Sequence, residues 1–109
     1  MTTRNLDALF HPNAIAVIGA SNAPGSVGQV LSRNLLESGF AGPVLPVSLS
    51  ARAIRSSIAY RSVAELPLVP DLAVIATPAP SVPGIVAELA QAGCRAALVI
   101  SAGVDAPLR

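Results

Sequence analysis

Four short aliphatic runs recur along the chain and predict buried strands. They occupy residues 14–19, 44–47, 72–76 and 96–100, and each is rich in Val, Ile, Leu or Ala. Each run ends close to a glycine, a proline or a small polar residue. Unbroken apolar runs of this length are typical of strands covered on both faces of a parallel sheet.

Between the first two runs, apolar residues follow a helical spacing over residues 26–38. Gly39 stands where a C′ glycine ends a helix. The residues predicted to share one helical face are Val27, Val30, Leu31, Leu35 and Leu36.

A second helix is predicted from residue 82 to about residue 92. Ser81 is a candidate N-cap, Pro83 falls in the first turn, and Gly93 stands at the end. The predicted buried stripe consists of Val82, Ile85, Val86 and Leu89. By contrast, residues 48–60 show no period and are expected to form a connecting loop. Residues 63–66 are expected to add one helical turn.

Strands that alternate with helices predict βαβ units with right-handed crossovers. The expected fold class is α/β, a Rossmann-like open parallel sheet of about four strands with helices on both faces. We expect one domain over residues 1–109. We expect it to be incomplete at its C-terminus, because the last six residues hold no whole element.

The composition agrees with an aliphatic core and argues against nucleic acid and membranes as binding partners. Hydrophobic residues make up 52% of the chain, aromatic residues 3%, and the net charge is +1. All basic residues are scattered arginines, so nucleic acid is not an expected partner. There is no apolar run of about 18 residues and no apolar leader, so we expect a cytoplasmic protein that does not enter a membrane.

The carboxyl ends of the strands are the expected ligand site, since open α/β sheets bind ligands there. The first turn, residues 19–28, is glycine-rich and opens the first helix. Free N–H groups and the helix dipole at Gly25, Ser26 and Gly28 would favour a phosphate. Each such hydrogen bond to a charged group contributes roughly 1.5–3 kcal/mol.

Two common phosphate-binding patterns are incomplete here. A P-loop requires a lysine after its last glycine, whereas Ser26 follows Gly25 and the chain has no lysine. The NAD fingerprint requires a second glycine where Ser21 stands and an acid near the end of the second strand, where Ser48 stands. Another diphosphate carrier remains, and CoA is one.

Segments spread over nearly the whole chain resemble the N-terminal CoA-binding domain of the NDP-forming acyl-CoA synthetases. That family includes ADP-forming acetate–CoA ligases, some fused to an acetyltransferase, and relatives of the succinyl-CoA synthetase α subunit. The matching segments are residues 6–12, 16–21, 24–28, 34–36, 39–44, 70–78, 82–83, 95–97 and 101–103.

The resemblance implies that the chain binds CoA or acyl-CoA through residues at the four strand ends. The implied contacts are Gly19, Ala20, Ser21, Gly25, Ser26, Val27, Gly28, Val47, Ser48, Thr77, Pro78, Ser101 and Gly103. It also implies further ligase and ATP-grasp domains as partners. The family's phosphorylated histidine is expected beyond this chain, and His11 does not match it, so we expect no catalysis by this chain alone.

The chain departs from the family after the second strand. The family usually has Val-Asn-Pro-Lys there, whereas residues 47–50 are Val-Ser-Leu-Ser, and Ser56 replaces an expected glycine. A phosphate-reaching base is therefore missing, and Arg52 and Arg55 are candidates to replace it.

Three alternatives stay open at this point. The same crevice could hold NAD(P) or another nucleotide, or the chain could be a remnant that binds neither. Ser21 and Ser26 could act as caps instead of ligand contacts.

Overall fold

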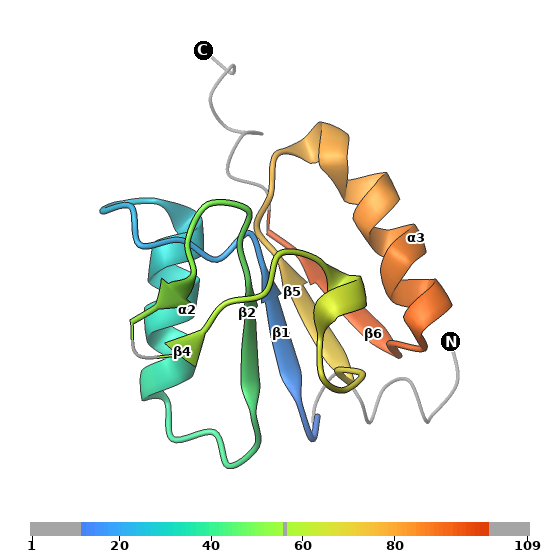
Figure 1. The fold of residues 1–109 in the computed structure, drawn as a ribbon, viewed down its shortest axis with the longest axis horizontal. Helices are drawn as coiled ribbons and strands as arrows, with labels where there is room; N and C mark the ends of the chain where they lie inside the picture. Colours follow the sequence, from blue (N-terminus) through green and yellow to red (C-terminus); the bar gives the residue numbers. More distant parts are fainter. Residues whose placement is uncertain (1–11, 56, 101–109) are drawn as a thin grey trace.

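The computed structural model describes residues 12–55 and 57–100, which form a parallel sheet with helices on both faces (Figure 1). The four strands are β1 (Ile15–Ile18), β2 (Val44–Val47), β5 (Leu72–Ile75) and β6 (Ala96–Val99). Their order in the sheet is β2-β1-β5-β6, and every neighbouring pair is parallel. The predicted α/β class and all four predicted strands are confirmed.

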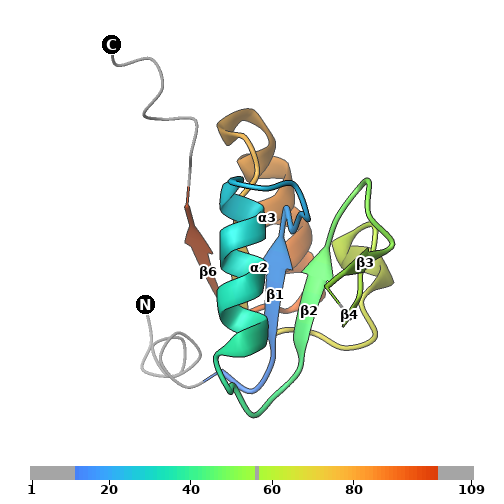
Figure 2. The same ribbon diagram turned by 90° about the vertical axis from the view of Figure 1, so that its left-hand side faces the viewer.

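Alternate residues of the strands divide the core into two layers. Ala16 and Ile18 of β1 face α3 (Val82–Ala92), together with the single helical turn η1 (Val63–Glu65). Ile15 and Val17 face the other side, where leucines of α2 (Val27–Glu37) cover the sheet. Figure 2 shows α2 in front of the strands and α3 behind them. The two-residue period of a strand produces this division.

Helix α2 begins and ends as its sequence predicts. The side chain of Ser26 accepts a hydrogen bond from the Gln29 N–H, and Gly39 adopts φ +82° just past the end. Its fully buried positions, however, are Gly28 and Ser32, whereas the predicted leucines are partly buried. Small residues at these two positions let the helix backbone approach the sheet closely.

Helix α3 differs from its prediction in two respects. Ser81 precedes the helix but does not cap it, because its hydroxyl donates to the Pro78 carbonyl within the short helical turn η2 (Ala79–Ser81). Val86 is 41% exposed and does not belong to the buried stripe. The predicted end is confirmed, since Gly93 adopts φ +96°.

The segment predicted as a loop, residues 48–60, contains a small hairpin. Strands β3 (Ala53–Ile54) and β4 (Ser57–Ile58) pair antiparallel, and Tyr60 then bridges to Val47 at the end of β2. Strands of two residues are too short to show an alternating pattern, which is why the sequence analysis missed them. The hairpin places this segment along the edge of the sheet beside β2.

Within the described ranges, no helix has both the length and the apolarity that crossing a bilayer requires.

Candidate functional site at the carboxyl ends of the strands

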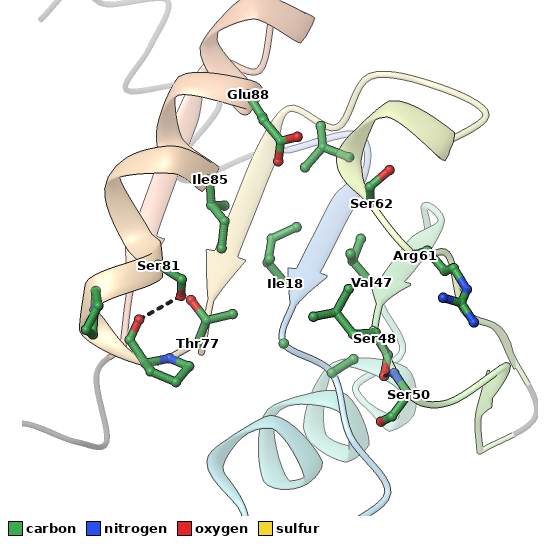
Figure 3. Close-up of a pocket in the computed structure, with 16 residues that line it drawn as sticks. Ile18, Val47, Ser48, Ser50, Arg61, Ser62, Thr77, Ser81, Ile85 and Glu88 are labelled. Carbon is green, nitrogen blue, oxygen red and sulfur yellow. Dashed lines mark hydrogen bonds between the residues drawn. The ribbon is translucent and has the colours of Figure 1, made fainter.

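A cleft of about 630 Å³ opens where β1, β2 and β5 end. Its size falls in the usual range for small-molecule sites. Figure 3 shows its walls: Ile18 lies at the base, α3 and Thr77 form one side, and Val47 with Ser48 and Arg61 forms the other. The cleft thus lies at the sheet edge where open α/β folds bind ligands.

The base of the cleft depends on a close approach between the ends of β1 and β5. A Cβ atom on Gly19 would lie 3.0 Å from the Ala76 carbonyl oxygen and 3.0 Å from Thr77 Cγ2. Gly19 also has φ +91°, a conformation that L side chains rarely adopt. A glycine is therefore required there by both space and backbone geometry.

The amide groups at this turn are mostly engaged by the protein itself. Gly19 and Ala20 both donate to the Val47 carbonyl at 3.0 Å, which ties the end of β1 to the end of β2. Ala23 donates to Ser21 Oγ at 2.9 Å, and the Ser26 N–H donates to the Ala23 carbonyl at 3.2 Å. The expectation of a free Ser26 N–H is therefore wrong, since the turn closes on itself.

Three N–H groups at this turn keep no acceptor within the described part of the chain: those of Gly25, Val27 and Gly28. Val27 and Gly28 are the first two residues of α2, where no carbonyl lies four residues earlier in the helix. These groups are the turn's remaining donors for an anion.

Ser48 closes the opposite wall through its side chain. It is 5% exposed, and its hydroxyl accepts from the Ala51 N–H at 3.1 Å. Its own N–H donates to the Tyr60 carbonyl at 2.8 Å. The serine that departs from the family pattern thus holds the following loop in place.

One buried polar atom in the cleft has no partner. Thr77 Oγ1 is shielded from solvent, and no hydrogen bond to it forms within the described residues. The neighbouring Ser81 hydroxyl is committed to the Pro78 carbonyl at 2.8 Å. A buried hydroxyl without a partner is uncommon and suggests a polar ligand group at this point.

Charged groups stand at the rim of a cleft whose exposed lining is mostly apolar. Arg61 lies on the β2 side, and Glu88 reaches in from α3 (Figure 3). Arg55 does not contribute, because its guanidinium pairs with Glu37 of α2. The structure thus places Arg55 in an ion pair with Glu37 and outside the cleft lining.

The structure gathers about half of the sequence-predicted contacts around the cleft: Gly19, Ala20, Val47, Ser48, Thr77 and Pro78. It places the remainder of the first turn outside the lining: Ser21, Gly25, Ser26, Val27 and Gly28. Gly28 nonetheless packs directly behind the cleft floor, since a Cβ there would lie 2.1 Å from the Gly19 carbonyl oxygen. Ser101, Gly103 and His11 lie outside the described residues.

Sequence reasoning missed several lining residues: Leu49, Ser50, Arg61, Ser62, Val63, Pro80, Ile85 and Glu88. Most belong to the segment after the hairpin or to α3. Those residues follow no strand end, so a rule that reads only strand ends has no means to select them, whereas Leu49 and Ser50 follow β2 and were passed over because they depart from the family pattern.

The fold and the cleft together define an open α/β domain of the ligand-binding type. Comparison with known proteins names the family. Residues 13–108 match the family described as CoA binding domain, so the chain belongs to that family.

Several relatives are ADP-forming CoA ligases. The chain is 41% identical over 103 residues to the acetate–CoA ligase (ADP-forming) I subunit alpha of Pyrococcus furiosus, covering 91% of this chain and 22% of that protein. It is 36% identical over 95 residues to a 4-hydroxybutyrate–CoA ligase (ADP-forming) of Nitrosopumilus maritimus, covering 87% and 14%. The chain therefore spans about a fifth or less of these relatives.

A solved structure agrees with the sequence comparison. The dinucleotide forming acetyl-coenzyme A synthetase 1 of Candidatus Korarchaeum cryptofilum, in complex with phosphate and ADP, matches with a TM-score of 0.83 and 39% identity. The match covers 93% of this chain and 22% of that one. The predicted family resemblance is confirmed.

Proposed function

We propose that this chain binds CoA or acyl-CoA in the cleft at the ends of β1, β2 and β5. It would do so as the CoA-binding domain of an ADP-forming acyl-CoA synthetase, with ligase and ATP-grasp domains as partners.

The observation that carries the proposal is the unpartnered hydroxyl of Thr77 inside an apolar cleft. The flexible arm of CoA is a mostly apolar chain interrupted by amides. Its methylene groups suit walls such as Ile18, Val63 and Ile85, and an amide would satisfy the Thr77 hydroxyl. Gly28 packs behind the same floor, and the three free N–H groups of the first turn to which it belongs suit a diphosphate.

Calorimetric titration of the chain with CoA tests the proposal directly. We expect saturable binding with a negative heat-capacity change, because apolar surface of the cleft is buried. Absence of heat at millimolar CoA, or tighter binding of NADH than of CoA in competition, would contradict it. The NADH arm addresses the nucleotide alternative, for which Ser48 offers no ribose-binding carboxylate.

Substitution Thr77→Val separates a ligand role from a structural one. Replacing a buried hydroxyl that lacks a partner by a methyl group removes a desolvation penalty of about 1–3 kcal/mol, so the free chain should become more stable. CoA binding should become weaker, because the ligand loses a hydrogen bond.

Ser38→Ala is the matched control for this test. It also removes a hydroxyl, but from the exposed end of α2, outside the cleft. It should lower stability slightly and leave CoA affinity unchanged. Equal CoA affinity of Thr77→Val and the wild-type chain would exclude Thr77 from the site.

A further inference from the structure

A second cleft of about 470 Å³ adjoins the first and carries two arginines. Arg52 and Arg61 both line it, and Leu49, Ser50 and Arg61 line both clefts. The two clefts therefore meet at these shared residues.

The β3–β4 hairpin brings these arginines together. Ala53 pairs with Ile58, and the Ala59 N–H donates to the Arg52 carbonyl at 2.8 Å, so Arg52 lies opposite Ala59. Arg61 follows two residues later, beyond the end of β4. The hairpin thus brings both arginines to the lining of the second cleft.

Neither guanidinium is neutralised within the described residues. The side-chain ion pair found there joins Arg55 and Glu37. Glu65 also lines the second cleft, but its carboxylate accepts from the Arg61 backbone N–H at 3.1 Å and forms no ion pair with either arginine. Two arginines and one glutamate leave this cleft with an excess of positive charge.

Two guanidinium groups that face one cleft repel each other, and an anion between them removes that repulsion. Arginine suits phosphate in particular, because its planar fork donates two parallel hydrogen bonds. CoA carries two separate anionic groups, a diphosphate and a ribose 3′-phosphate. The free N–H groups at the start of α2 can serve the diphosphate, which leaves the arginines available for the second phosphate.

We propose that Arg52 and Arg61 form a subsite for the ribose 3′-phosphate of CoA. This inference rests on the proposed function of CoA binding and adds to it a preference between two related ligands. The chain selects CoA over dephospho-CoA through two arginines of the hairpin segment. The subsite lies after the position where the family's lysine is replaced by Ser50.

The test compares CoA with dephospho-CoA by calorimetry at low salt, for the wild-type chain, Arg52→Gln, Arg61→Gln and the double variant. Arg33→Gln is the matched control, since Arg33 is an exposed arginine of α2 that lines neither cleft. Circular dichroism of each variant verifies the fold.

We expect the wild-type chain to bind CoA at least about tenfold more tightly than dephospho-CoA, because one charge-assisted hydrogen bond contributes roughly that factor in affinity. Each single substitution should reduce that preference several-fold, and the double variant should bind both ligands equally. Arg33→Gln should retain the full preference.

Two results would overturn the subsite while leaving CoA binding intact. One is equal affinity of the wild-type chain for both ligands. The other is an equal loss for both ligands in the arginine variants, which would place the arginines at another group. If the wild-type chain binds neither ligand, the proposed function fails and the subsite fails with it.

Discussion

Replacing Gly28 by alanine should separate α2 from the end of β1. The new Cβ atom would lie 2.1 Å from the Gly19 carbonyl oxygen, whereas real Cβ contacts essentially never fall below 3.0 Å. Both partners are backbone, so no side-chain rotation can relieve the contact. The start of the helix must therefore move by roughly 1 Å in an interior that is already close-packed.

The movement has a definite energetic consequence. Overpacking of this kind typically costs about 1–3 kcal/mol. The shift also disturbs the first turn, where the N–H groups of Val27 and Gly28 have no acceptor within the described residues. We therefore expect Gly28→Ala to lower the free energy of unfolding by about 1–3 kcal/mol and to weaken CoA binding.

Gly84→Ala provides the matched control. Gly84 also lies in the first turn of an eleven-residue helix, but nothing lies within 4 Å of its Cβ position and its φ is not positive. Alanine is better than glycine in a helix by about 1 kcal/mol, so Gly84→Ala should stabilise the chain.

Urea unfolding of the three proteins measures both effects. The reasoning about Gly28 is refuted if Gly28→Ala is as stable as the wild-type chain, or gains stability as Gly84→Ala does. Either result would show that α2 does not rest against the Gly19 carbonyl.

Three further substitutions or conditions test other parts of the structure. Leu89→Ala removes a side chain that is 2% exposed beneath the sheet and should cost about 2–5 kcal/mol in urea unfolding; a loss below 1 kcal/mol would contradict its place in the core. Arg55→Gln breaks the ion pair with Glu37, but both side chains are about half exposed, so unfolding should change by less than about 1 kcal/mol; a larger loss would show that this pair fixes the hairpin on α2. Burial raises the pKa of the Cys94 thiol, and backbone hydrogen bonds at Ala96 and Arg95 partly oppose that shift. Iodoacetamide should therefore alkylate Cys94 more slowly in the folded than in the urea-unfolded chain, and stability should fall as pH rises from the unfolded toward the higher folded pKa. Equal rates in both states would indicate an exposed thiol.

The comparison of sequence with structure shows where local information suffices. Aliphatic runs such as residues 72–76 are strands because a buried parallel strand requires continuous apolar character on both faces. Gly39 and Gly93 end their helices because each adopts a positive φ that other residues reach only with strain. These features depend on a residue and its near neighbours, so the sequence alone determined them.

The cleft depends on contacts that no local pattern contains. The hydroxyl of Ser21 accepts from the Ala23 N–H, and the hydroxyl of Ser26 donates to the Ala23 carbonyl. Only the folded turn shows that both serine side chains are occupied by nearby backbone. The β3–β4 hairpin shows no period in the sequence, yet it positions Arg61 at the first cleft and Arg52 at the second.

The family and the sheet edge that carries the cleft could thus be predicted from the sequence, because strand ends of parallel runs meet at one edge. Which side chains meet there was decided by tertiary structure. Ile85 and Glu88 come from a helix on one face, Arg61 comes from the segment after the hairpin, and Thr77 is left with a buried hydroxyl between them. Only the packing of α3 and the hairpin against the sheet brings residues so distant in sequence to a common cleft.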